Sequence, residues 1–364
     1  MPPIPSSFSG EILEIPEIWV DNFENRFKKA YFLSHYHADH VVGLEKSSFF
    51  DAIKQTGANI YMSESTSKIF EERVQDPDAY EYVVPLKLGT TTVAIDTDLF
   101  IEVTLIPAGH CIGSVMFLFR TINKTILYTG DFRISPNDIS KYAQFHKNGE
   151  PINIDVMYVD TTFIKDQHPT FPKRSDTVDE MVHRIDSWLK EAPNNRIAIH
   201  TSGSYTSEFS FREIHRRLGK KVCVKKELWM FYSRFPEIAP AVTCDEYDPE
   251  IHLCYYISYK NRCHYKQYLG NNYLSLHMSA RKWTAYESDQ NMLKDSFSND
   301  TIDVCFATHC SRSELLSFVN YFNPTKVVGF PNPYDQNSPK KVEVHDFVKS
   351  QRKRKLNLLD TLEK

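Results

Sequence analysis

The sequence predicts an α/β protein in which a strand-rich part is interrupted by an inserted part of alternating helices and strands. Short runs of β-branched and aromatic residues fill the first 160 residues, and several end in aspartate or histidine. Between about 165 and 300, helical periodicity alternates with strand-like runs, which is typical of parallel pairing. A run that ends in His309 then returns to the earlier pattern, and a helix at about 311–322 and a strand at 326–330 follow.

The composition limits the classes of protein to which the chain can belong. With 364 residues, 41% of them hydrophobic, the chain can bury the cores of two domains. Its net charge of −4 gives no global basic character, so an interface for nucleic acid must be local. We expect no membrane partner, because no apolar run reaches the length of a membrane span and the N-terminus lacks a secretory pattern. The seven cysteines are expected to be thiols or metal ligands rather than disulfides.

The first part is expected to form short strands that carry polar residues at their ends. The strand-like runs are 17–21, 29–35, 101–110, 115–120, 125–131 and 156–160. The residues that stand at their ends are Asp21, His35, His110, Asp131 and Asp160. Side chains in such positions are carried on a rigid sheet, which suits a site that needs fixed geometry.

The inserted part is expected to begin with an amphipathic helix. Thr177 and Glu180 fit a capping box, and apolar residues from Val178 to Leu189 recur at helical spacing. A strand, a helix and a second strand follow, which predicts a parallel α/β unit. Their expected ranges are 196–200, about 207–218 and 221–225.

The segment LSHYHADHVVG, residues 33–43, places three histidines and an aspartate within six positions. His35 and His37 alternate by two, so in an extended segment both side chains point to one side. Asp39 and His40 are expected to turn the chain into a helix and to present ligands in a second direction, which suits two metal ions. The spacing differs from the i, i+4 histidine pair of a helical zinc protease.

Two further candidate ligands follow strand-like runs. His110 lies between Gly109 and Gly113, where the backbone can fold close to an ion. Asp131 follows Gly130, and the two oxygens of its carboxylate can bridge metals about 3.5–4 Å apart. A single histidine beside a strand is more often an ordinary buried side chain. The clustering of ligand types, backed by the AGH and TGD segments, favours a metal site instead.

The order H-x-H-x-D-H, then Gly-His, then Gly-Asp at strand ends resembles the metallo-β-lactamase superfamily. The resemblance implies an αββα sandwich with a dinuclear zinc site at one edge. The resemblance implies that one zinc ion is held by His35, His37 and His110. The other would be held by Asp39 and His40, and Asp131 would bridge the two ions. Asp21 would support a ligand from behind.

Finer features resemble the DNA cross-link repair nucleases of the β-CASP branch, and within it the Artemis-type nucleases. The segments that carry this likeness are SSFSGEILEIP, AGHCIGSVMFLF, LYTGDFR and VDTTF. VDTTF places Asp160 at a strand end, and ATHCSRSELLSF supplies His309, which would complete the second zinc site or protonate the leaving oxygen. The stretch 326–335 lacks the histidine of the RNA-processing members, which favours DNA. The implied catalytic residues are Asp39, Asp131, Asp160 and His309, with Asp160 also supporting a ligand.

The resemblance also implies a division of the chain. A first metallo-β-lactamase part would span 1–162, a β-CASP domain 163–300 and a return part 301–345, followed by a basic tail at 346–364. The tail is interpreted as a nuclear address or a phosphate contact, with an ordinary solvated chain end as the alternative.

A structural zinc site in the inserted domain is implied by the same resemblance. Its ligands would be Cys223, His252, Cys254 and Cys263, with His264 as the alternative to the last. Four nitrogen and sulfur ligands with no open position would make the site closed and non-catalytic. Ordinary buried thiols are the alternative interpretation.

Basic residues of the inserted domain are the candidate contacts to DNA phosphates, because lysine and arginine bind phosphate without reading sequence. The candidates are Lys220, Lys221, Lys225, Lys226, Arg281 and Lys282, together with Arg212 and Arg216. Trp283 is expected to stack on an unpaired base. Each of these charges is alternatively a solvated surface residue.

These inferences predict a zinc-dependent, structure-selective DNA nuclease, with Mg²⁺ as a further metal. Two zinc ions would lower the pKa of a bound water and neutralise charge on the phosphoryl oxygens. The Artemis-type likeness implies hairpin opening, trimming of overhangs at single-strand/double-strand junctions and 5′–3′ exonuclease action, in double-strand break repair by non-homologous end joining in the nucleus, with an end-joining kinase or ligase as partner. The alternatives are a 5′ exonuclease of interstrand cross-link repair, a small-molecule metallo-hydrolase and a non-catalytic scaffold.

Overall fold

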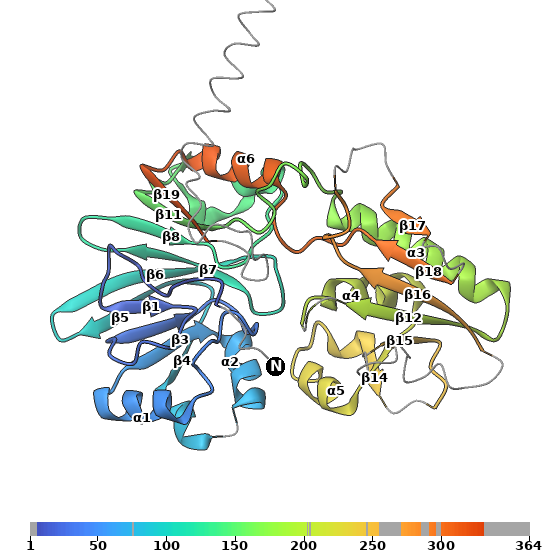
Figure 1. Ribbon diagram of the computed structural model, residues 1–364, viewed down its shortest axis with the longest axis horizontal. Helices are drawn as coiled ribbons and strands as arrows, with labels where there is room; N and C mark the ends of the chain where they lie inside the picture. The colour runs from blue at the N-terminus through green and yellow to red at the C-terminus, as the bar shows by residue number, and fades with distance from the viewer. Residues whose placement is uncertain are drawn as a thin grey trace, which may run out of the picture. The chain divides into compact units, whose positions relative to one another are not determined.

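Two β-sheets form the framework of the first of two units in the computed structural model (Figure 1). This unit comprises residues 1–165 and 309–364, and the second comprises 166–308. The residues that the structure describes are 6–74, 76–201, 203, 205–244, 247–254, 271–284, 291–295 and 300–330.

The four-stranded sheet of the first unit is parallel throughout. Its order is β1 (Ile18–Val20), β2 (Ala30–Leu33), β3 (Asn59–Ser63) and β4 (Val83–Leu86). Two helices lie on its outer side in Figure 1, namely α1 (Ser47–Thr56) and α2 (Glu64–Arg73). They bury apolar side chains such as Phe49 and Ile69, which are fully shielded from solvent.

The six-stranded sheet is mixed, with parallel pairing on one side and antiparallel pairing on the other. Its order is β19 (Lys326–Phe330), β11 (Val156–Asp160), β8 (Thr125–Tyr128), β7 (Val115–Arg120), β6 (Leu99–Pro107) and β5 (Gly89–Asp96). Short connecting elements are β9 (His146–Lys147), β10 (Glu150–Pro151) and the 3₁₀ turns Pro77–Tyr82, Pro136–Lys141 and Ala143–Phe145.

Aromatic side chains fill the space between the two sheets and the space between the six-stranded sheet and the helix at 312–322. Phe32 of β2 meets Phe117 of β7, with ring centroids 5.4 Å apart, in a core built from both sheets. On the other face of the six-stranded sheet, α6 (Arg312–Phe322) buries Phe318 against Phe132. The predicted helix–sheet–sheet–helix order is therefore confirmed.

The second unit is built on a seven-stranded sheet, parallel except for the antiparallel edge strand β17. Its order is β14 (Val242–Cys244), β13 (Val222–Val224), β15 (Ile251–Leu253), β12 (Asn195–Thr201), β16 (Asn272–Met278), β18 (Thr301–Val304) and β17 (Leu293–Asp295). Its helices are α3 (Arg174–Glu191), α4 (Glu208–Leu218), α5 (Lys226–Tyr232) and the 3₁₀ turn Ala239–Ala241. The predicted parallel α/β character of the insertion is confirmed.

Two local predictions are wrong. Thr177 does not cap a helix, because α3 has already begun at Arg174 and the Thr177 hydroxyl donates instead to the Lys173 carbonyl at 3.3 Å. No helix follows Asp39: the chain makes successive turns, and α1 begins only at Ser47. Gly43, between Asp39 and α1, has a non-helical φ of +90°, and a Cβ at this position would lie 2.6 Å from the backbone of Phe23.

The strand at 301–304 belongs to a different sheet from the one implied by a return part beginning at 301. β18 pairs with β16 and β17 in the second unit, and the first unit resumes only at His309. Strand periodicity identifies β18 as a strand but does not specify its neighbours. His309 consequently lies in a loop rather than at the end of a strand.

Glu208 is a buried carboxyl group at the start of α4. Its Oε1 accepts a hydrogen bond of 2.7 Å from the Tyr232 hydroxyl. Burial raises the pKa of Glu208 to about 7, although the hydrogen bond from Tyr232 opposes the shift. Since the usual value is 4.5, the folded state binds the proton more tightly than the unfolded state. Stability is therefore lost as the pH rises from the unfolded pKa through the folded pKa.

Glu208→Gln is expected to raise the free energy of unfolding at pH 8–9 by roughly 2–3 kcal/mol, because the amide cannot ionise, and to change it little at pH 5. Thermal unfolding of both proteins across this pH range measures the difference. The control is Glu213→Gln on the same helix, where the hydrogen bond from Arg216 lowers the pKa of Glu213, so this variant should lose stability at pH 8. Parallel pH curves for Glu208→Gln and the wild type would contradict the assignment.

Candidate metal centre

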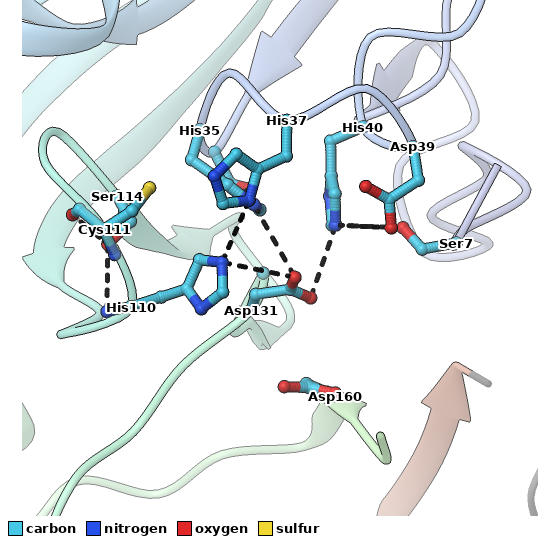
Figure 2. Close-up of polar contacts among 12 residues, drawn as sticks. Ser7, His35, His37, Asp39, His40, His110, Cys111, Ser114, Asp131 and Asp160 are labelled. Carbon is cyan, nitrogen blue, oxygen red and sulfur yellow. Dashed lines mark hydrogen bonds and ion pairs between the residues drawn. The ribbon is translucent and has the colours of Figure 1, made fainter. Parts of the chain in front are cut away.

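The candidate site lies where strands of the first unit's two sheets end. Asp21 follows β1, His35 follows β2, and Asp160 is the last residue of β11. β8 and β11 are parallel, and β6 runs in the same direction as β8 because β7 is antiparallel to both. Residues that follow β6 and β8 therefore reach the same edge. Figure 2 shows the outcome, in which imidazoles and carboxylates from separate loops point toward one another.

The carboxylate of Asp21 organises the loop that carries the histidine motif. Asp21 is fully buried and holds a left-handed backbone conformation, φ 53°. Its Oδ1 accepts the Ser34 amide at 2.7 Å, and its Oδ2 accepts the Ser34 hydroxyl at 2.5 Å and the Tyr128 hydroxyl at 2.9 Å. The same Oδ2 lies 2.8 Å from His40 Nδ1. Asp21 thus fixes the orientation of His40 while leaving its other nitrogen directed elsewhere.

Three histidines form the first group of candidate ligands. One nitrogen of each of His35, His37 and His110 lies within 4.8 Å of the others. His37 Nδ1 and His110 Nε2 are 3.1 Å apart. His35 and His110 are buried, and His37 is partly exposed. This crowding of imidazole edges is the arrangement that a shared cation would stabilise.

Asp131 lies between the first group and a second. Its Oδ2 is 3.6 Å from both His35 Nε2 and His110 Nε2, and its Oδ1 is 3.3 Å from His40 Nε2. Asp39, His40 and Asp131 form the second group within the same 4.8 Å limit. The two carboxylate oxygens of Asp131 therefore face different groups, as a bridging ligand would.

Asp160 and His309 form a third feature of the site. His309 Nδ1 lies 2.7 Å from Asp160 Oδ2 and 3.9 Å from Asp131 Oδ2. The other Asp160 oxygen accepts the Thr162 amide at 2.8 Å and the Thr162 hydroxyl at 2.6 Å. Asp160 is buried, whereas the His309 side chain retains 20% of its exposure and can meet a ligand.

The pKa shifts separate His35 from the histidines that face carboxylates. Burial, reinforced by the neighbouring histidines, lowers the pKa of His35 well below its usual range. Burial also acts to lower the pKa of His40, but the carboxylates of Asp131 and Asp39 outweigh it and raise this pKa well above its usual range. The pKa of His309 is also raised: burial acts to lower it, but the carboxylates of Asp160 and Asp131 outweigh burial.

The donor set fits a metal ion. His35 Nε2 is buried and has no hydrogen-bond partner among the described residues, although a buried polar nitrogen normally has one. Burial keeps this ring neutral, so its lone pair is available as a ligand. The mixture of imidazole nitrogens and carboxylate oxygens suits zinc, whereas magnesium prefers oxygen ligands alone. The buried histidine and aspartate clusters are thus consistent with a metal-binding site.

The structure brings together every residue that the sequence nominated as a ligand of the catalytic metals. They are His35, His37, Asp39, His40, His110, Asp131 and His309. Sequence analysis missed Cys111, whose sulfur lies within 4.8 Å of the first group, although its place beside His110 was a signal. It also missed Ser7, whose hydroxyl is 3.0 Å from His40 Nε2; no feature of its sequence neighbourhood indicated this contact.

The proposed structural zinc ligands lie on adjacent strands of the second unit. Cys223 on β13 is in register with His252 on β15, and Cys254 follows β15 directly. All three are buried. Cys263 and its alternative, His264, lie outside the described residues. The structural zinc site therefore stays a prediction.

The candidate phosphate contacts differ in their surroundings. Lys220 pairs with Glu250 and Lys282 pairs with Asp303, each at 2.7 Å, and Arg216 pairs with Glu213 at the same distance. The candidates with exposed side chains are Arg212, Arg216, Lys221, Lys225, Lys226, Arg281 and Lys282. The role predicted for Trp283 is wrong. Its side chain is 2% exposed and packs under Lys294, so it cannot stack on a base in this conformation.

Two other predictions concern the basic tail and the membrane. The basic tail at 346–364 and residues 331–345 lie outside the described residues. Within the part of the chain that is described, every helix is too short or too polar to span a membrane.

Comparison with known proteins identifies similar sequences. A family model described as DNA repair metallo-beta-lactamase matches residues 236–333. The chain is 30% identical to protein artemis of Homo sapiens over 361 residues, which cover 93% of this chain and 51% of that protein. It is 28% identical to the DNA cross-link repair 1A protein of Homo sapiens over 311 residues, covering 82% of this chain and 28% of that protein. The chain thus spans about half the length of the artemis protein.

A solved structure supports the fold. A protein of unknown function from Enterococcus faecalis V583 superposes with a TM-score of 0.56 at 14% identity, covering 84% of this chain and 76% of that one. Together with the family model, this likeness confirms a metallo-β-lactamase-like fold with the region characteristic of its DNA-repair members.

Asp21→Asn is expected to weaken zinc binding by about 10–100-fold, because it disturbs the hydrogen bonds that orient His40 and the Ser34 turn. Zinc titration with a competing chelator, read beside circular dichroism, measures the loss. Asp155→Asn is the matched control, since Asp155 accepts the Thr125 amide at the opposite end of β11. Wild-type zinc affinity in folded Asp21→Asn would contradict the supporting role.

Cys254→Ser is expected to remove one bound zinc per chain and to lower the thermal stability of the second unit, because a closed zinc site contributes directly to folding. Elemental analysis and limited proteolysis measure these effects. The control is Cys305→Ser, a second buried thiol of the same unit. Unchanged zinc content in folded Cys254→Ser would favour the ordinary buried thiol.

Proposed function

We propose, from the premise that the chain belongs to the Artemis-like branch of the β-CASP metallo-β-lactamase family, that it is a zinc-dependent DNA nuclease. The observation that carries this proposal is Asp131, whose two oxygens face separate groups of histidine nitrogens at 3.3–3.6 Å. Such an arrangement suits hydrolysis of a phosphodiester, whose anionic charge repels an attacking nucleophile.

Two metal positions follow from the proposal. The three-histidine group with Asp131 would hold one ion, and Asp39, His40 and Asp131 would hold the other. Bound zinc supplies Lewis acidity, which activates water and neutralises charge on the phosphoryl oxygens. Asp21 keeps Nδ1 of His40 engaged, so that Nε2 is directed to the second position.

His309 is proposed to act on the leaving oxygen, with completion of the second metal position as its alternative role. The 2.7 Å contact with Asp160 fixes the imidazole ring and favours its protonated form. Thr162 in turn holds Asp160 through its amide and hydroxyl. A proton donor oriented in this way would neutralise the developing charge on the leaving oxygen as the phosphorus–oxygen bond breaks. Asp39, which is partly exposed, would orient the attacking group.

The likeness to artemis supports the finer proposal. We propose structure-selective cleavage of hairpins, overhangs and single-strand/double-strand junctions in non-homologous end joining, a nuclear location and an end-joining kinase or ligase as partner. The exposed lysines of the second unit, such as Lys221 and Lys226, are proposed to contact phosphates. The likeness to the cross-link repair 1A protein favours a second candidate, a 5′ exonuclease.

Purified protein with zinc restored and magnesium added is expected to cut an end-labelled DNA hairpin near its tip. Asp39→Ala and Asp131→Ala should each lower the rate by at least roughly 100-fold, because losing a ligand costs more than losing a residue that supports one. Mapping of the cuts on a sequencing gel gives the answer. The matched control is Asp138→Ala, which removes an exposed carboxylate paired with Lys141.

A 5′-phosphorylated single strand in the same assay separates the two candidates. Stepwise release of single nucleotides from its 5′ end, with the hairpin left intact, would favour the 5′ exonuclease over the hairpin-opening endonuclease. Near-normal hairpin cleavage by either ligand variant would refute the metal assignment. Absence of cleavage on both substrates, in zinc-loaded folded protein, would contradict a nuclease that acts alone.

A further inference from the structure

Arg133 and Glu314 form a buried ion pair between two segments that carry site residues. Arg133 lies two residues beyond Asp131, and Glu314 lies in the first turn of α6, five residues beyond His309. Arg133 Nη2 donates to Glu314 Oε1 at 3.0 Å, and Nε lies 3.3 Å from both carboxylate oxygens. The two side chains are only 6% and 13% exposed.

Glu314 has a second task at the start of α6. Its Oε2 accepts the Ser311 amide at 2.8 Å, while the Ser311 hydroxyl accepts the Glu314 amide at 3.3 Å, which completes a capping box. A capping box needs only its serine and its glutamate. The guanidinium of Arg133 is therefore an addition that helix capping does not explain.

Backbone hydrogen bonds bring further site segments to the same place. The Cys310 amide donates to the Phe132 carbonyl at 2.9 Å, and the Arg133 amide donates to the Ala108 carbonyl at 2.9 Å. Three loops are thus tied together around Arg133. They carry the candidate ligands His110, Asp131 and His309.

Burying this pair is expensive, because both charges lose their hydration, so stability alone is a weak reason for it. Its position suggests a different reason. His309 is the first residue of the segment that returns to the first unit, immediately after the chain leaves the second. A loop in that place needs an anchor within the first unit if its imidazole is to keep a fixed distance from Asp131 and Asp160.

We propose that the Arg133–Glu314 ion pair is a positioning device that holds His309 in register with Asp131 and Asp160. The proposal rests on the proposed nuclease function where it is tested by kcat. Where it is tested by the chemical reactivity of His309, it depends on the geometry of the site alone. Neither residue is assigned contact with substrate or metal; both act through His309.

Two conservative variants weaken the pairing without removing the helix cap. Glu314→Gln keeps an N3 residue that completes a capping box but abolishes the charge, and Arg133→Lys keeps the charge but loses the planar fork. Each is expected to lower kcat by about tenfold or more, since small misplacement of a reacting group costs this much, while KM for the hairpin and zinc content stay near wild type. The control is Glu14→Gln, which breaks the ion pair with Lys326 in the same unit.

A double-mutant cycle shows whether the effect passes through His309. In a His309→Ala background, Glu314→Gln is expected to cause no further loss of kcat. An equal loss in both backgrounds, or wild-type kcat in Glu314→Gln alone, would overturn the proposal. Arg133→Lys serves as the second variant if Glu314→Gln does not fold.

A chemical measurement separates failure of this proposal from failure of the nuclease assignment. Diethyl pyrocarbonate is applied to zinc-loaded protein, and carbethoxylation of each histidine is followed by mass spectrometry. His309 is expected to react severalfold faster in Glu314→Gln than in the wild type. His146, held by the Tyr321 hydroxyl at 2.7 Å, should not change. Absence of cleavage of both DNA substrates by the wild type contradicts a nuclease that acts alone. Equal His309 reactivity in both proteins is the result that contradicts the positioning role.

Discussion

The buried carboxylate of Asp21 is the constraint on which the candidate metal centre depends. A charged group with no exposure is tolerable only when donors surround it, and Asp21 is met by the Ser34 amide and hydroxyl, Tyr128 and His40. These contacts tie the loop after β2 to the end of β1 and to β8 in the other sheet. The same interactions that compensate the buried charge therefore also orient a candidate ligand. Structure and proposed chemistry are coupled at this residue.

Much of the site was predictable because its residues are chemically unusual in their place. His35, His37, Asp39 and His40 would need hydrogen-bond partners if they were buried in an ordinary loop, so their clustering pointed to a bound ligand. The helix–sheet–sheet–helix order followed from the resemblance that these residues carry. Contacts made by common residues were not predictable. Ser7 at His40 and Glu314 at Arg133 join positions far apart in the chain, and their local sequence does not specify these partners.

The failed predictions share one cause, which is that tertiary contacts override local patterns. Gly43 has a positive φ and lies so close to the backbone of Phe23 that a Cβ would not fit, and the segment that suggested a helix makes turns. Strand periodicity was right for 301–304 but did not specify the sheet that the strand joins. Trp283, beside Arg281 and Lys282, suggested a surface for bases, yet the indole is buried while its basic neighbours are exposed.

The proposed nuclease requires two metal ions, one on either side of Asp131. The most direct test is a crystal structure of zinc-soaked protein with anomalous difference density recorded at the zinc absorption edge. We expect two peaks flanking the Asp131 carboxylate, one reached by His35 Nε2 and the other by His40 Nε2. Absence of density at both positions in fully soaked crystals, with His35 Nε2 bonded to a protein group or to water instead, would contradict the metal centre and the nuclease proposed from it.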